Sequence, residues 1–148
     1  MSEKIKFTTT FIPLNVKNLN GHIYLDNDNL RESIDELNKR TIKYGCVYGE
    51  YNYPYENVFD TNLSKVSHVI DNVRIEDDKV VGDVTILHTK HGKELINNYQ
   101  NMVFRPRSAG IVEENGLVVI KKLFTFDAVD KDADAFLDLN KIEENKNE

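Results

Sequence analysis

The stretch NMVFRPRSAGIV, residues 101–112, has apolar ends like those of a buried strand but a charged centre. Residues 102–104 and 111–112 are apolar or β-branched, which predicts one strand across the stretch. Pro106 stands in the middle, between Arg105 and Arg107. Because proline has no N–H to give to a ladder, we expect this strand to lie at a sheet edge or to carry a bulge.

Arg105 and Arg107 are alternate residues of this predicted strand, so both side chains would point to the same face. Two guanidinium groups on one face can bind an anion or a carboxylate. The alternative interpretation is that both pair with the acid surplus of the protein's own surface. Ser108 would point to the opposite face, unless Pro106 introduces a bulge.

The sequence on either side of this stretch predicts further strands. Glu113 to Gly116 is a hairpin turn, with Gly116 suited to a positive φ, and it leads into a last strand or strand pair. Asp77-Asp78 joins two earlier segments into a hairpin. The five further segments that we expect to be strands are 5–14, 46–51, 66–76, 79–87 and 117–129.

Two segments have the spacing and end signals of helices. Residues 28–44 place apolar side chains at helical spacing after an Asp-Asn-Asp cap, and Gly45 can end the helix. Thr89 can cap a shorter helix that runs to about Tyr99. The predicted class is therefore α+β: a small, mostly antiparallel β-barrel, closed or half-closed, with about two flanking helices. We expect one domain over residues 1–135 and an acidic polar tail over 136–148.

Composition and motifs exclude several classes of function. The chain has 148 residues and a net charge of -6, which argues against a nucleic-acid binder. No apolar run is long enough to cross a membrane, and a lone cysteine, Cys46, favours a reducing compartment. Asp130 to Asp134 opens like a calcium loop but lacks the glycine and the final glutamate, and His88 and His91 have no third ligand nearby. We therefore expect no metal and no cofactor.

Five segments run in the same order as in the prohead core proteases of tailed phages, which resemble the herpesvirus assemblins. They are NGHIYLDNDNLRESIDELNKR (20–40), GEYNYP (49–54), VSHVIDNVRIEDDKVVGDVTILHTKHGKEL (66–95), FRPRSAGIV (104–112) and FTFDAVD (124–130). The resemblance covers residues 20 to about 135. It implies an assemblin-like β-barrel and a role in phage capsid maturation.

The same resemblance implies that both catalytic positions have changed. The family's histidine belongs to a motif like Gly-Glu-Leu-x-His-Pro, and here Tyr53 takes its place after Glu50. The family's serine belongs to a run like Ser-Ser-Arg-Gly-x-Gly, and here Arg105 and Pro106 stand at the serine positions. Because a serine protease without these groups loses several orders of magnitude in rate, the resemblance implies an inactive relative.

Three functions follow as hypotheses from this comparison. The first is a virion or capsid-assembly protein that binds capsid, scaffold, portal or protease partners in the host cytoplasm, with Arg105, Arg107, Tyr53 and Glu50 as candidate binding residues. The second is a maturation serine endopeptidase with a rearranged site that uses Ser108 and His68. The third is a host-directed phage protein that binds a small anion or nucleotide through the two arginines.

Overall fold

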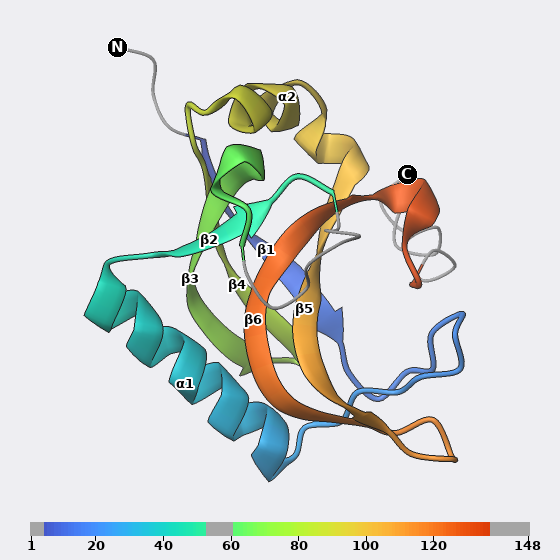
Figure 1. The fold of residues 1–148 in the computed structure, drawn as a ribbon. Helices are drawn as coiled ribbons and strands as arrows, with labels where there is room; N and C mark the ends of the chain where they lie inside the picture. The colour runs from blue at the N-terminus through green and yellow to red at the C-terminus, as the bar shows by residue number, and fades with distance from the viewer. Residues whose placement is uncertain (1–4, 53–60, 137–148) are drawn as a thin grey trace.

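The computed structural model describes residues 5–52 and 61–136, and these form two antiparallel sheets and two helices. The strands and helices are β1 (Lys6–Pro13), α1 (Asp28–Tyr44), β2 (Val47–Glu50), β3 (Val66–Glu76), β4 (Lys79–Ile86), α2 (Lys90–Asn98), β5 (Met102–Val112) and β6 (Val118–Asp130). Short 3-10 turns follow at Leu63–Lys65, Tyr99–Asn101 and Lys131–Ala133. Figure 1 shows the long β5–β6 hairpin standing in front of the other strands.

The strands pair in two separate sheets. One has four strands in the order β1-β4-β3-β2, and the other is the β5–β6 hairpin alone. The predicted α+β class, the two helices and the antiparallel pairing are confirmed. Within the described residues the two sheets do not close into a continuous barrel, which leaves the half-closed arrangement. The segment 117–129 forms one strand rather than a pair.

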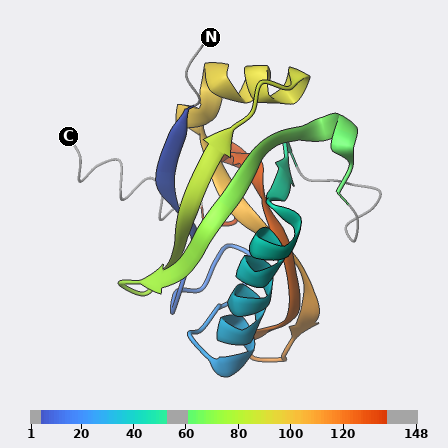
Figure 2. The same ribbon diagram turned by 90° about the vertical axis from the view of Figure 1, so that its left-hand side faces the viewer.

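Helix α1 begins and ends as its sequence predicts. The Asn27 side chain accepts a hydrogen bond from the Leu30 N–H at the start, and Gly45 ends the helix with φ 88°. Leu30, Ile34 and Leu37 are buried on the inner face. The helix lies against β6 and β3 (Figure 2), so it covers part of the core that the four-stranded sheet leaves open.

The turns between strands use the residues that their geometry requires. Asp77 and Asp78 connect β3 to β4 with φ values of 49° and 60°, a pair of positive angles typical of a tight hairpin turn. Gly116 adopts φ 90° in the turn between β5 and β6, as predicted. Both hairpins are therefore specified locally by the sequence.

The core joins the two sheets. Phe11 of β1 stacks on Phe126 of β6 with ring centroids 4.1 Å apart, and both side chains are fully buried.

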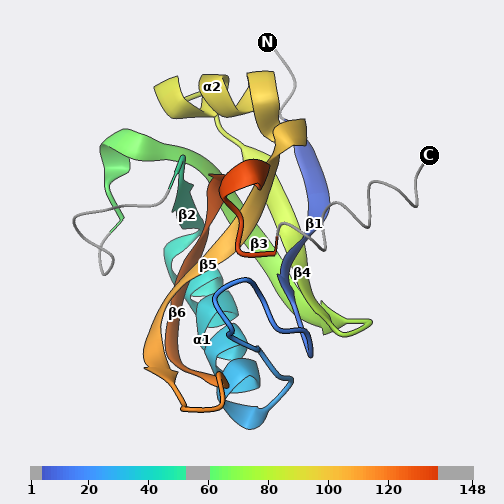
Figure 3. The ribbon, with the colours of Figure 1, turned by 90° about the vertical axis from the view of Figure 1, so that its right-hand side faces the viewer.

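Helix α2 lies at one end of the four-stranded sheet, away from the tip of the β5–β6 hairpin (Figure 3). No helix among the described residues has the length and apolar character needed to cross a membrane.

The pairing of β5 with β6 explains why Pro106 is tolerated. Pro106 lies opposite Phe126, whose carbonyl faces away from β5 and binds His68 Nε2 at 2.8 Å. Because directly opposed residues of an antiparallel pair either bond to each other or both face away, the backbone of Pro106 also faces away from β6. The missing N–H therefore costs no ladder hydrogen bond.

Irregularities do interrupt this pairing, but the extra residues belong to β6. The register shifts between Arg107 and Ser108, where Phe124 is the extra residue of β6. It shifts again between Ala109 and Gly110, where Lys121 is unpaired. The strand β5 thus keeps its alternation, and Pro106 itself introduces no bulge in β5.

Isolated contacts, most of them from side chains, rather than continuous ladders join the hairpin to the edges of the four-stranded sheet. At what we call the β1–β5 junction, Arg105 Nη1 donates to the backbone oxygens of Thr10 and Phe11 at 3.2 and 3.3 Å. At the β2–β6 junction, Thr125 Oγ1 donates to the Tyr48 oxygen and the Asn52 N–H to the Ala128 oxygen, both at 2.8 Å. These few contacts join the two sheets at places where a closed barrel would have continuous backbone ladders.

Candidate functional site

The candidate site is built on Arg105 and Arg107 of β5, whose side chains lie at different junctions. Both residues are almost completely buried, at 5% and 4% exposure. A buried charge is costly unless it is paired and hydrogen-bonded, so the partners of each guanidinium define the site.

Arg105 binds Asp134 at the β1–β5 junction. Its Nε and Nη2 atoms donate to the two carboxylate oxygens of Asp134, each at 2.9 Å, in a bidentate pair. Its Nη1 atom donates to the backbone oxygens of β1 and to the Phe104 oxygen. The ring of Phe136 lies 5.2 Å from the guanidinium carbon. Arg105 therefore fastens three segments together: β1, β5 and the chain after β6.

Arg107 binds two carboxylates at the β2–β6 junction. It donates to both oxygens of Asp127, at 2.9 Å from Nε and 3.1 Å from Nη2. Its Nη2 atom also lies 3.1 Å from Glu50 Oε2. Asp127 in turn accepts the Glu50 backbone N–H at 2.9 Å. The carboxylates of Glu50 and Asp127 are fully buried, so these contacts replace their hydration.

The Glu50–Arg107–Asp127 cluster holds two carboxylates against one guanidinium. Burial raises the pKa of Asp127 to about 6; the Arg107 charge works against that rise, and the Glu50 charge adds to it. Glu50 Oε2 accepts the Asn62 N–H at 3.1 Å, whereas Glu50 Oε1 is buried with no hydrogen-bond partner among the described residues. The cluster is therefore an electrically unbalanced, protonatable centre.

His68 belongs to the same junction as a structural connector. It is fully buried; its Nε2 lies 2.8 Å from the Phe126 oxygen, and its Nδ1 lies 2.7 Å from Ser67 Oγ. Because a carbonyl can only accept, Nε2 must carry the proton and Ser67 must donate to Nδ1. Burial lowers the pKa of His68 to about 4, so the ring is neutral at physiological pH.

The proposed catalytic pair is not assembled in this structure. Both ring nitrogens of His68 are occupied by Ser67 and Phe126, and within the described part of the chain no hydrogen bond joins Ser108 to a histidine. Ser108 lies half-buried on β5, beyond the register shift. Tyr53 falls outside the described residues. The functional roles assigned to these residues stay predictions.

The two arginines do not form the open anion clamp that their spacing suggests. Each guanidinium is directed at the protein's own carboxylates, and both pairs are buried rather than at the surface. A polar cavity of about 200 Å³ does adjoin Arg105 and Pro106, lined also by His22, Tyr24 and Asp134. Arg107 is not among the residues that line this cavity.

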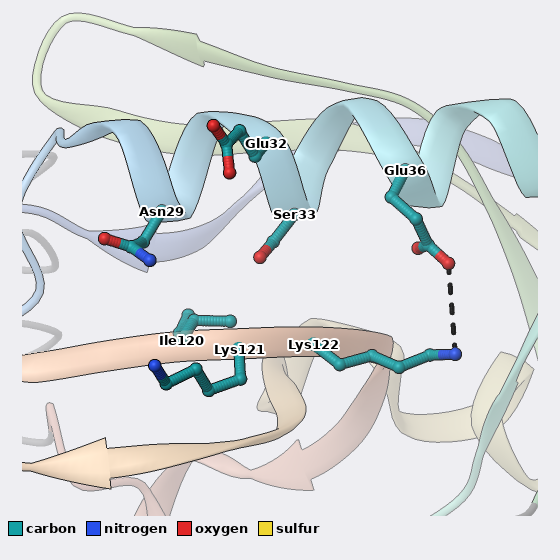
Figure 4. Close-up of a pocket in the computed structure, with 7 residues that line it drawn as sticks. All are labelled: Asn29, Glu32, Ser33, Glu36, Ile120, Lys121 and Lys122. Carbon is teal, nitrogen blue, oxygen red and sulfur yellow. Dashed lines mark ion pairs between the residues drawn. The ribbon is translucent and has the colours of Figure 1, made fainter.

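A second cavity of about 200 Å³ separates α1 from β6 (Figure 4). Helix residues Glu32 and Glu36 face strand residues Lys121 and Lys122 across it, and Glu36 and Lys122 form a long ion pair at 3.9 Å. None of the candidate site residues lines this cavity, so it is separate from the site on β5.

Sequence reasoning missed the acidic partners, Asp127 and Asp134. Asp127 lies inside β6, whereas Asp134 lies in the acidic run that follows this strand. The only sequence signal for them as partners was the protein's surplus of acids. Phe136, placed by the sequence at the start of the tail, is buried beside Tyr24 and Arg105. The rest of the predicted tail, 137–148, falls outside the described residues.

Comparison with known proteins places the fold. No protein-family model matches the sequence, and no curated protein matches it. Among solved structures, the bacteriophage T4 capsid assembly protease gp21 superposes with a TM-score of 0.66 over 86% of this chain and 90% of that chain, at 17% sequence identity. The chain therefore has the fold of a phage capsid assembly protease.

Proposed function

We propose that this chain is a phage assembly protein that acts in the host cytoplasm by binding another structural protein, such as the capsid, scaffold or a protease partner, rather than by cutting it. The observation that carries the proposal is the pair of buried, fully engaged arginines, Arg105 and Arg107, on the strand where the family resemblance expects a nucleophile. The fold shared with a capsid assembly protease supports the setting.

The electrostatics of the site also favour binding over catalysis. A general base must reach the proton of its nucleophile, and both ring nitrogens of His68 are engaged inside the core. Its lowered pKa makes it a weak base at neutral pH. The same fold can keep its framework while its site takes on another role.

The test is to incubate the purified protein with the capsid and scaffold proteins encoded by the same phage. We expect stable co-purification with one of them and no new fragments by mass spectrometry. Fragments that disappear in Ser108→Ala, with Ser64→Ala as the matched control on an exposed turn, would instead establish the rearranged protease.

A further inference from the structure

We propose that the outer edge of β5, from Ser108 to Val112, pairs with the same edge of a second copy of this chain. The proposal starts from an exposed strand edge. Gly110, Ile111 and Val112 are all exposed, with Ile111 at 55% and Val112 at 49%. This half of the hairpin projects beyond the four-stranded sheet (Figure 1).

The hydrogen-bond pattern identifies which groups of β5 face outward. Val118 donates its N–H to the Ile23 oxygen at 3.0 Å, so its backbone faces away from β5. Val112 lies opposite Val118 and must face away as well, and the alternation continues to Gly110 and Ser108. Within the described residues, no hydrogen bond reaches the outward backbone groups of these three residues.

Several other outward groups of the hairpin are capped. Arg40 donates to the oxygens of Leu123 and Phe124, and His68 binds the Phe126 oxygen. Arg105 covers the Phe104 oxygen at the other end of β5. An uncapped strand edge with exposed apolar side chains is a template for pairing with another strand. The edge from Ser108 to Val112 also has no charged residue to prevent such pairing.

The sequence of this edge is complementary to itself. In an antiparallel pair centred on Gly110, the outward groups of Ser108, Gly110 and Val112 meet those of Val112, Gly110 and Ser108 of the second copy. Each exposed Ile111 then packs over the small Ala109 of the other copy, and each Val112 beside Ser108. This large-to-small match in the pairs on either side of Gly110 favours a second copy as the occupant.

Gly110 suits the centre of such a pair. It has no side chain to obstruct a second backbone, and a Cβ added there would lie 2.1 Å from the Val119 oxygen, so β6 itself requires glycine at this position. The resulting two-fold interface is isologous and forms a continuous β6-β5-β5-β6 sheet. Because only five residues pair on each side, we expect a weak dimer that dissociates on dilution.

Sedimentation velocity over a wide range of protein concentration tests the proposal. We expect a reversible monomer–dimer equilibrium, and the substitution Ile111→Lys should weaken it by about tenfold or more, because lysine on an edge strand opposes pairing. The matched control is Ile42→Lys, an equal change of charge at a helix residue that is 85% exposed. A chain that stays monomeric at every concentration, or a dimer that Ile111→Lys leaves unchanged, would overturn the proposal.

Disulfide trapping tests the register separately. In a Cys46→Ser background, the double variant Ala109→Cys, Ile111→Cys should form two symmetric intermolecular disulfides on mild oxidation, because these residues form a closely spaced pair. The single variant Ile111→Cys should not, because the two copies of residue 111 are offset along the strands. Trapping by the single variant alone would show a different register and refute the one proposed.

Discussion

The two junctions of the β5–β6 hairpin use the same residue type in different electrical settings. At the β1–β5 junction one guanidinium, Arg105, meets one carboxylate, Asp134, and its remaining donors bind backbone oxygens. At the β2–β6 junction Arg107 meets the two carboxylates of Glu50 and Asp127. Among the described residues, the first junction joins one cation to one carboxylate and the second joins one cation to two. The difference teaches that two arginines separated by one residue can hold two junctions of different charge, one of which includes a carboxylate with a raised pKa.

The largest expected effect comes from Arg107→Met. It leaves two buried carboxylates without a cation, and removing one partner of a buried ion pair costs about 3–5 kcal/mol. Urea unfolding followed by circular dichroism measures the loss, since the chain has no tryptophan. The loss should shrink at pH 5, where Asp127 binds a proton. An equal loss at pH 5 and pH 7.5 would contradict the unbalanced cluster.

Arg105→Met should cost less, about 3 kcal/mol, because only one carboxylate loses its partner. Combining it with Asp134→Asn should cost much less than the sum of the two single changes, since both remove the same pair. Urea midpoints of the four proteins measure the coupling. Losses that simply add in the double variant would contradict the bidentate pair between Arg105 and Asp134.

Two groups of the β2–β6 junction make the free energy of unfolding change with pH in opposite directions. The pKa of His68 falls to about 4 on folding, so its contribution is complete above pH 6.5 and is lost as the pH falls toward 4. The pKa of Asp127 rises to about 6, so its contribution is complete below pH 3.8 and is lost as the pH rises through 6. Each amounts to about 3 kcal/mol, and together they nearly cancel between pH 4 and 6.

Single substitutions should therefore uncover each dependence. Relative to the wild type, His68→Gln should gain stability as the pH falls from 6 to 4, whereas Asp127→Asn should lose it. Urea unfolding at pH 4, 5, 6 and 7 measures both slopes. Parallel pH profiles for the three proteins would show that neither group titrates as described.

The smallest expected effect is that of Glu50→Gln. It removes one of the two negative charges beside Arg107 and leaves a balanced pair, so stability at pH 7 should change by no more than about 1 kcal/mol. The Glu50 charge contributes to the raised pKa of Asp127. The pH dependence of stability in the His68→Gln variant should therefore be weaker when Glu50→Gln is added. An unchanged slope would mean that the two carboxylates do not interact.

The local features of the fold could be predicted from the sequence. Helix α1 has the predicted bounds because its cap at Asn27 and its end at Gly45 are written in neighbouring residues. The hairpin turns at Asp77 and Gly116 are local in the same way. The sequence could not show that the sheets stay separate, because that depends on contacts between residues far apart in the chain.

The candidate site was less predictable for the same reason. Pro106 predicts an edge strand or a bulge, and the edge position of β5 is confirmed. The chemistry of the site depends on Glu50 and Asp127, which are 77 residues apart and meet only in the folded chain. The spacing of residues along a strand predicts which face a side chain lies on, but not which carboxylate it binds.

The closing of both junctions by isolated contacts rather than continuous ladders has a kinetic consequence. The β3–β4 and β5–β6 hairpins are local and can form early, whereas the contact from Arg105 to Thr10 spans 95 residues. Interactions made after the rate-limiting step of folding mainly govern the rate of unfolding. Weakening either junction should therefore shorten the lifetime of the native state far more than it slows its formation.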